Sequence, residues 1–156
     1  MPTLMFIDDD AVLCSLYDRV FTTAHFTVTQ ASSCAQAIQR LEQFTPDIVL
    51  VDMSLSDGSG WQVVSWMRAQ PRFQATHVII VSGNRQYEDE LDAYGADCFL
   101  YKPVSLDMLL SLVGRFVKFS STETAQTVET YQTATQAKLG VNLSTETGYV
   151  GWIANS

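Results

Sequence analysis

The chain has 156 residues, of which 47% are hydrophobic and 17% charged, and its formal net charge is −8. This length and composition allow a buried core, so we expect a soluble globular protein with one domain and an appendage. The negative charge, without a lysine or arginine cluster, argues against direct nucleic-acid binding, which requires phosphates to be neutralised.

No targeting or membrane segment is evident. The first residues lack a basic start followed by an apolar segment, and no apolar run is long enough to span a bilayer. We therefore expect no membrane insertion and a cytoplasmic location. The cysteines are Cys14, Cys34 and Cys98, which form no Cys-x-x-Cys pair, so they are expected to be small buried residues rather than disulfide or zinc ligands.

The first apolar run, Leu4 to Ile7, ends at three consecutive aspartates, residues 8–10. A predicted strand therefore terminates in carboxylates. Asp10 is expected to cap a helix, because apolar residues follow it at helical spacing as far as Ala24.

The second unit is a strand of modest hydrophobicity, Phe26 to Gln30, and a helix that opens at Ser32-Ser33 and ends before Thr45-Pro46. Ile48 to Val51 is then a continuous apolar run, which is typical of a strand buried on both faces of a parallel sheet. That run ends at Asp52. A carboxylate there is expected at the carboxyl edge of the sheet, where open α/β folds bind their ligands.

After Asp52, residues 53–60 are expected to form a loop with two glycines, and residues 61–67 a helix that ends at Gln70-Pro71. His77 to Val81 is another continuous apolar run, so it too predicts a buried strand. Ser82 follows it and places a hydroxyl at the same edge.

The last elements repeat this alternation. Arg85 to Tyr94 is predicted to be a polar helix, for which Gly95 supplies a left-handed end. Cys98 to Tyr101 is the fifth strand, Lys102-Pro103 follows, and the last helix spans Ser105 to Lys118. The residues expected on its core side are Leu106, Leu109, Leu110, Val113 and Val117. Five strands alternating with five helices predict an α/β fold with a doubly wound parallel sheet.

Side chains at the ends of parallel strands meet at one edge, so five polar residues are expected in one cleft. They are Asp8, Asp9, Asp52, Ser82 and Lys102. Two carboxylates about 4 Å apart repel by roughly 1 kcal/mol in water and about 4 kcal/mol at an effective dielectric constant near 20, so a cation is expected. Oxygen ligands favour Mg²⁺.

The other side chains of the cleft suit phosphoryl chemistry. Lys102 is a compact charge that can pair with the acceptor carboxylate, Asp52, or with an oxygen of a transferred phosphoryl group. The Ser82 hydroxyl could hydrogen-bond another such oxygen, which leaves Asp52 as a nucleophile able to form an acyl phosphate. Catalysis would then consist mainly of positioning and neutralising charge.

With this set of residues, positions 3–118 resemble a response-regulator receiver domain of two-component signalling, similar to the chemotaxis receivers. The resemblance implies a flavodoxin-like five-stranded sheet and phosphoryl transfer from a histidine kinase or histidine phosphotransfer protein to Asp52. It implies that Asp8 and Asp9 hold Mg²⁺ together with Asp52 and the main-chain carbonyl of Ser54.

The same resemblance assigns a role to four further residues. Ser82 matches the switch hydroxyl, Phe99 the aromatic rotamer switch, Lys102 the invariant-type lysine, and Pro103 the proline after a cis peptide. The sequence departs from the family in two places. Ser56 stands where many members carry proline, which would loosen the loop, and Phe99 lacks the hydroxyl of the commoner tyrosine.

Two other classes are alternatives. A phosphatase of haloacid-dehalogenase type also uses a nucleophilic aspartate with Mg²⁺, but it would require a second aspartate where Ser54 stands. A non-catalytic flavodoxin-like binding module would require a phosphate-binding loop after the first strand, and aspartates occupy that place.

The composition changes after the last helix. We predict a receiver domain over residues 1–119 and a Thr/Ser/Gln-rich extension, linker or association arm over residues 120–156, in which residues 141–153 are a weakly specified hairpin. The extension is too short for a winged-helix or catalytic output domain. We therefore expect a signalling switch that catalyses its own phosphorylation and dephosphorylation, not an enzyme with a separate output activity.

The last helix also suggests association. Met108, Leu112 and Phe116 place apolar groups on a second, outward-facing side of it. The family resemblance implies pairing or docking through the fourth helix, fifth strand and fifth helix. We therefore expect a homodimer through that surface or through the C-terminal arm.

Overall fold

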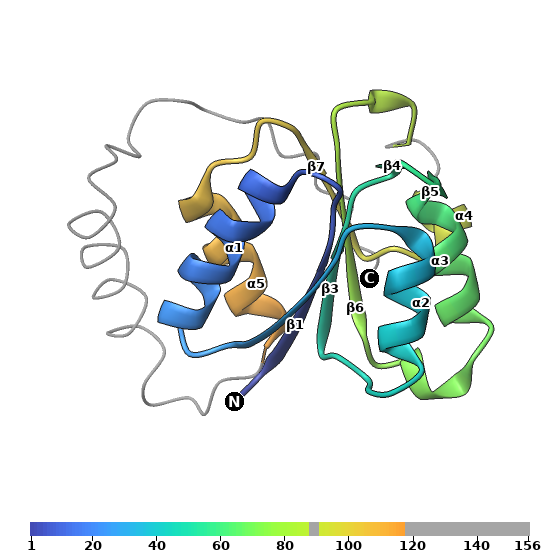
Figure 1. Cartoon of the computed structure of the whole chain (residues 1–156), viewed down its shortest axis with the longest axis horizontal. Helices are drawn as coiled ribbons and strands as arrows, with labels where there is room; N and C mark the ends of the chain where they lie inside the picture. The colour runs from blue at the N-terminus through green and yellow to red at the C-terminus, as the bar shows by residue number, and fades with distance from the viewer. Residues whose placement is uncertain (88–90, 118–156) are drawn as a thin grey trace.

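A parallel sheet of five strands forms the centre of the computed structural model, which describes residues 1–87 and 91–117 (Figure 1). The strand order is β2-β1-β3-β6-β7, and every neighbouring pair is parallel. The strands are β1 (Thr3–Ile7), β2 (Thr27–Ala31), β3 (Ile48–Val51), β6 (His77–Ser82) and β7 (Cys98–Tyr101). The predicted doubly wound α/β sheet is confirmed.

Helices cover both faces of this sheet (Figure 1). Two of them, α1 (Ala11–Thr23) and α5 (Leu106–Phe116), lie on one face. The other face is covered by α2 (Cys34–Leu41), α3 (Gly60–Arg68) and the short α4 (Leu91–Tyr94). None of the helices in the described part of the chain combines the length and the apolar character that a membrane crossing requires.

The core consists of two layers, because alternate residues of each strand point to opposite faces. On β1, Leu4 and Phe6 pack with α1, whereas Met5 and Ile7 pack with residues of α2 and α3. This two-sided burial explains the continuous apolar runs. Each fully buried aliphatic side chain contributes roughly 1.5–3 kcal/mol to folding.

Side-chain caps begin four helices. The capping residues are Asp10 for α1, Ser33 for α2, Ser59 for α3 and Ser105 for α5. The expected cap at Asp10 is confirmed, since its carboxylate accepts the backbone N–H groups of Val12 and Leu13 at 2.9 and 3.0 Å. Each such cap contributes about 1 kcal/mol. The left-handed residue expected at Gly95 is also found, with φ of 64°.

The three cysteines are free thiols, as expected. Cys14 and Cys34 are buried, and Cys98 is half-buried. Burial raises the pKa of each thiol to about 11, so at neutral pH these side chains are protonated.

Three predictions about elements need correction. Residues 53–60 are not only a loop, because β4 (Ser54–Leu55) and β5 (Gly58–Ser59) pair as a small antiparallel hairpin. The predicted fourth helix is divided into a 3₁₀ turn, η2 (Arg85–Tyr87), and α4, which begins after residues 88–90.

Leu112 of α5 is not outward-facing but buried, at 7% exposure. Leu110 and Val117, expected on the core side, are partly buried and pack against the core. Lys118 and the predicted hairpin at residues 141–153 lie outside the described residues.

Arg68, the last residue of α3, connects several main-chain segments at the amino ends of β6 and β7. Its Nε donates to the Gly95 carbonyl at 2.7 Å, and Nη1 donates to the carbonyls of Phe73 and Thr76 at 2.7 and 3.1 Å. Nη2 pairs with Asp97 at 3.4 Å. Phe73 ends the 3₁₀ turn η1 (Pro71–Phe73). One guanidinium group therefore satisfies three loop carbonyls at the sheet edge opposite the carboxyl ends of the strands.

Candidate functional site

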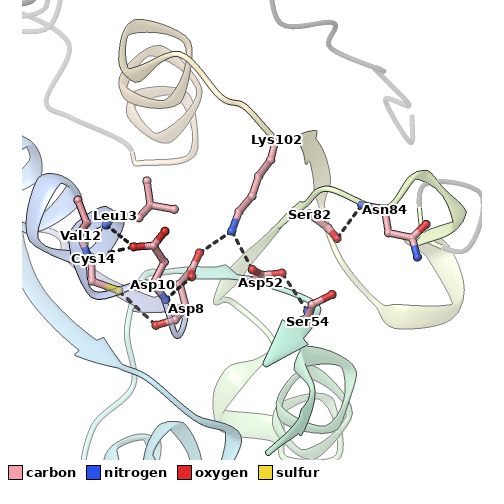
Figure 2. A network of polar contacts seen from close by, with 10 residues as sticks. All are labelled: Asp8, Asp10, Val12, Leu13, Cys14, Asp52, Ser54, Ser82, Asn84 and Lys102. Carbon is pink, nitrogen blue, oxygen red and sulfur yellow. Dashed lines mark hydrogen bonds and ion pairs between the residues drawn. The ribbon is translucent and has the colours of Figure 1, made fainter. Parts of the chain in front are cut away.

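Three strands end in the same local structure at the carboxyl edge of the sheet. Asp8 after β1, Asp52 after β3 and Ser82 at the end of β6 each use a side-chain oxygen to accept the backbone N–H two residues further on (Figure 2). The distances are 2.9 Å to Asp10 N, 2.9 Å to Ser54 N and 3.2 Å to Asn84 N. These short-range bonds turn the chain out of each strand and fix the direction of the side chain.

Lys102 joins two of the three strand ends. Its Nζ donates to Oδ2 of Asp8 and to Oδ2 of Asp52, at 2.7 Å in both cases (Figure 2). Its backbone N–H donates to the carbonyl of Ser82 at 3.0 Å, and the Lys102-Pro103 peptide is cis, as the resemblance implied. Partial burial by itself would lower the pKa of Lys102, but the hydrogen bonds to Asp52 and Asp8 outweigh it and raise that pKa.

Asp8, Asp9 and Asp52 form an acidic cluster. One carboxylate oxygen from each lies within 4.8 Å of the others. Asp8 and Asp52 are buried, at 5% and 8% exposure, whereas Asp9 is exposed. Among the described residues, the Lys102 ammonium group pairs with two of these three carboxylates, so negative charge is in excess, and the donors of the cluster are all oxygens. This set fits a hard divalent cation that keeps part of its water shell.

The main chain places Asp52 with little freedom. Its N–H donates to the Ile7 carbonyl at 2.8 Å, which aligns the end of β3 with the end of β1. Gly60, the first residue of α3, lies directly against it, because a Cβ at Gly60 would be 2.2 Å from the Asp52 carbonyl oxygen. The close approach therefore requires glycine at this position.

The structure brings together most of the residues predicted for the cleft. Asp8, Asp9, Asp52 and Lys102 are in contact or close to one another. Ser82 lies at the same edge, but its hydroxyl is bonded within its own turn. Phe99 is buried in the core on the α2–α3 side of β7, at 3% exposure. Ser54 belongs to β4, and its N–H is bonded to Asp52.

Sequence reasoning missed two features of the site. The first is the Lys102–Asp8 pair, because Lys102 was expected to interact with Asp52 or a phosphoryl oxygen. The second is Asp57, whose carboxylate accepts the backbone N–H groups of Cys34 and Ala35 at 2.8 and 3.0 Å. An Asp-Gly pair signals a turn, but nothing local in the sequence points to a partner more than 20 residues away.

Comparison with known proteins identifies the family. The family model described as "Response regulator receiver domain" matches residues 4–114. The DNA-binding dual master transcriptional regulator RpaA of Synechocystis is 27% identical over 115 residues, which are 72% of this chain and 48% of that protein. The cell cycle response regulator CtrA of Brucella ovis is 27% identical over 146 residues, 92% of this chain and 60% of that protein. The chain thus spans about half the length of the regulators it matches.

Solved structures agree on the fold. The chemotaxis response regulator CheY4 of Vibrio cholerae has a TM-score of 0.70 at 20% identity, over 75% of this chain and 99% of that one. The response regulator TrrA of Thermotoga maritima, solved with Mg²⁺ and BeF, has a TM-score of 0.68 at 19% identity, over 75% and 100%. From the family match over most of its length and from this fold, the chain belongs to the response regulator receiver domains of two-component signalling.

Proposed function

We propose that this receiver takes a phosphoryl group on Asp52 in a Mg²⁺-dependent reaction. The observation that carries the proposal is the state of the Asp52 carboxylate. It is buried at the end of β3, with one oxygen held by the Ser54 N–H and the other by Lys102 Nζ, beside two further carboxylates. A carboxylate fixed in this way is oriented for attack on phosphorus.

The donor would be a phosphohistidine of a histidine kinase or of a histidine phosphotransfer protein, since proteins of this family exchange phosphoryl groups with them. An Asp52 oxygen attacks the phosphorus, a P–O bond forms and the P–N bond breaks. The imidazole nitrogen keeps the bonding electron pair. Lys102, which already donates to an Asp52 oxygen, would pair with an oxygen of the transferring group. The Ser82 hydroxyl accepts the Asn84 N–H in its turn, so its own hydrogen could be donated to another oxygen of that group.

The residues that would hold Mg²⁺ are Asp8, Asp9 and Asp52, with the main-chain carbonyl of Ser54. Their support is the oxygen-only donor set within 4.8 Å and its excess negative charge. The ion, when bound, neutralises oxygens of the transferring group. The chain's own residues orient the nucleophile and supply the positive charge of Lys102.

Phosphorylation by a small donor tests the proposal without the cognate kinase. Incubation with phosphoramidate or acetyl phosphate and Mg²⁺ should add the mass of one phosphoryl group to the intact protein, and Asp52→Asn should add none. The matched control is Asp47→Asn at the amino end of the same strand. Asp47 accepts bonds from the Thr3 N–H and hydroxyl at 2.7 and 2.8 Å, which an amide oxygen can also accept. Asp47→Asn should therefore be labelled like the wild type. A labelled Asp52→Asn protein, or an unlabelled wild type, would contradict the assignment.

We also propose that the whole chain pairs through the surface of α4, β7 and α5 together with residues 120–156. On this surface Met108 and Phe116 of α5 are half-buried, and the Tyr101 ring of β7 lies against the guanidinium group of Arg85 from the adjacent η2, at 4.8 Å. Aromatic and arginine side chains of this kind are enriched in protein contacts.

A further inference from the structure

Asp57 links the hairpin that follows the acceptor to a helix on the same face of the sheet. It is exposed and lies in the turn between β4 and β5, and its two carboxylate oxygens accept the first two N–H groups of α2. A second contact runs parallel to these, because the Cys34 thiol donates to the Ser59 carbonyl at 3.4 Å. The tip of the hairpin is therefore attached to the beginning of α2.

The same hairpin contains Ser54. Ser54 pairs with Ser59 across the hairpin, and its N–H is bonded to Asp52. Each strand of the hairpin has only two residues, and an isolated two-stranded hairpin is marginal in water. Its order must therefore come from contacts outside it, which include the half-buried Leu55 against the core, the Gly60 N–H bond to the Met53 carbonyl, and the bonds of Asp57 and Ser59 to α2.

Because residue 56 is serine and not proline, the turn of the hairpin is not restricted by its own sequence, and the Asp57 bonds to α2 can supply that restriction. A proline there would restrict the backbone of the turn, as it does in many receivers, whereas serine leaves the backbone its full freedom. The Asp57 bonds restrict the same turn from outside. The Ala35 and Cys34 N–H bonds also lower the pKa of Asp57, so the carboxylate is charged at neutral pH and lies at the positive end of α2.

We propose that Asp57 is a positioning residue for the divalent cation. By fastening the hairpin to α2, Asp57 holds the Ser54 main-chain carbonyl in place. This inference rests on the proposed function, in which that carbonyl is a ligand. Asp57 itself does not touch the cation or the reacting atoms. It acts through the hairpin backbone, so its loss weakens the binding of Mg²⁺ without removing a ligand.

The experiment compares two losses at the beginning of α2. Asp57→Ala removes the link to the hairpin, whereas Ser33→Ala removes the local cap of the same helix, in which the Ser33 hydroxyl accepts the Gln36 N–H at 3.1 Å. Both variants lose helix-capping bonds, but only the first frees the hairpin. Asp57→Asn keeps one acceptor oxygen and serves as the conservative variant. Near-ultraviolet circular dichroism establishes that each variant is folded.

Mg²⁺ affinity is measured by titration calorimetry well below the melting temperature, and hydrogen exchange of the Ser54 amide is measured without metal. Asp57→Ala should raise the Kd for Mg²⁺ about tenfold, the lower end of the effect typical for groups that orient metal ligands. Its Ser54 amide should exchange faster, and Asp57→Asn should lie between it and the wild type. Ser33→Ala should match the wild type in both measurements.

If Asp57→Ala binds Mg²⁺ like the wild type, or if Ser33→Ala weakens binding equally, Asp57 is only a helix cap and the inference is wrong. A wild type that binds no Mg²⁺ overturns the proposed function instead. The two failures are therefore distinguishable.

Discussion

Asp8 and Asp52 occupy equivalent positions on neighbouring strands, and the structure treats them alike. Each has one oxygen bonded to the N–H two residues on and the other bonded to Lys102. Their surroundings differ, because only Asp52 is followed by a hairpin and by the close approach of Gly60. Asp9 differs from both, since it is exposed and contributes charge to the cluster from its rim.

At the residue scale, Asp9→Asn should remove most of the stabilisation by Mg²⁺. A cation that binds only the folded state adds about 2.7 kcal/mol to the free energy of unfolding at a concentration 100 times its Kd, so Mg²⁺ should raise the melting temperature of the wild type. Without Mg²⁺ the variant should be no less stable than the wild type, because one of three crowded carboxylates has become neutral.

Asp10→Asn is the control for the Asp9 variant. It removes the adjacent charge, but asparagine caps helices as well as aspartate, so α1 and the response to Mg²⁺ should both persist. The measurement is thermal unfolding with and without Mg²⁺. A clear loss of stability of Asp9→Asn in the absence of metal would instead make Asp9 a structural acceptor.

The sequence predicted the residues of the acidic cluster because they follow apolar runs, and runs on parallel strands must end at one edge. It could not predict which pairs form within the cluster. The flexible side chain of Lys102 could reach either Asp8 or Asp52. It bonds both because β1 and β3 are neighbouring strands that bring the two carboxylates close together. The role of Asp57 was equally hidden, because its partners belong to another element.

At the element scale, the start of α3 is constrained more strongly than its sequence suggests. Ser59 caps the helix, and the Gly60 N–H donates to the Met53 carbonyl at 3.1 Å, which closes the segment that begins after the acceptor. Helix α3 therefore begins where the β4–β5 hairpin comes back to the residues that follow β3. Because Gly60 lies directly against the Asp52 carbonyl, we expect a shift of α3 toward β3 to displace the main chain of Asp52.

Gly60→Ala should accordingly disturb both stability and phosphorylation. The new Cβ would lie 2.2 Å from the Asp52 carbonyl oxygen and 2.7 Å from Cγ2 of Val51, so either the helix or the acceptor must move. We expect a destabilisation of about 1–3 kcal/mol in urea unfolding, as for other overpacked sites, and slower labelling by phosphoramidate.

Gly114→Ala in α5 provides the comparison for the same substitution. A Cβ at Gly114 meets no atom within 4 Å, so alanine there should be neutral or stabilise the protein by up to about 1 kcal/mol through its helix propensity. Labelling of this variant should equal that of the wild type. Equal urea midpoints for the two alanine variants would show that Gly60 has no special packing role.

The bounds of the elements were predictable where burial decides them. Continuous apolar runs marked β3 and β7 to the residue. The hairpin β4–β5 was missed because two-residue strands carry no hydrophobic period. In α2 the buried Cys34 and Ala37 are small and have the same apolar character as the exposed Ala35, so residue type alone does not define the buried face of this helix.

At the scale of the whole molecule, the described residues form two core layers, one on each face of the sheet. Every buried residue of the two clusters lies between Leu4 and Val113, and the half-buried residues that pack against them extend to Val117. Because Leu112 is buried, only Met108 and Phe116 remain of the three residues expected on the outward-facing apolar side of α5. The predicted domain boundary at residue 119 lies outside the described residues.

A shortened chain that ends at Ser121 should therefore fold and be a monomer. Its melting temperature should stay within about 4 °C of the full chain, the shift that roughly 1 kcal/mol produces in a domain of this size. Light scattering on both chains tests the pairing proposal, because a dimer of the full chain should dissociate on shortening. A shortened chain that remains dimeric would place the contact within residues 1–121.

The position of Arg68 has a practical consequence. The bonds of its guanidinium group to three carbonyls and to Asp97 hold the loops at the amino ends of β6 and β7, at the edge of the sheet farthest from Asp52. A sensor surface or a dye attached beside these loops would leave the reactive edge facing solution. Immobilised in that orientation, the receiver could report the arrival and loss of phosphoryl groups in real time.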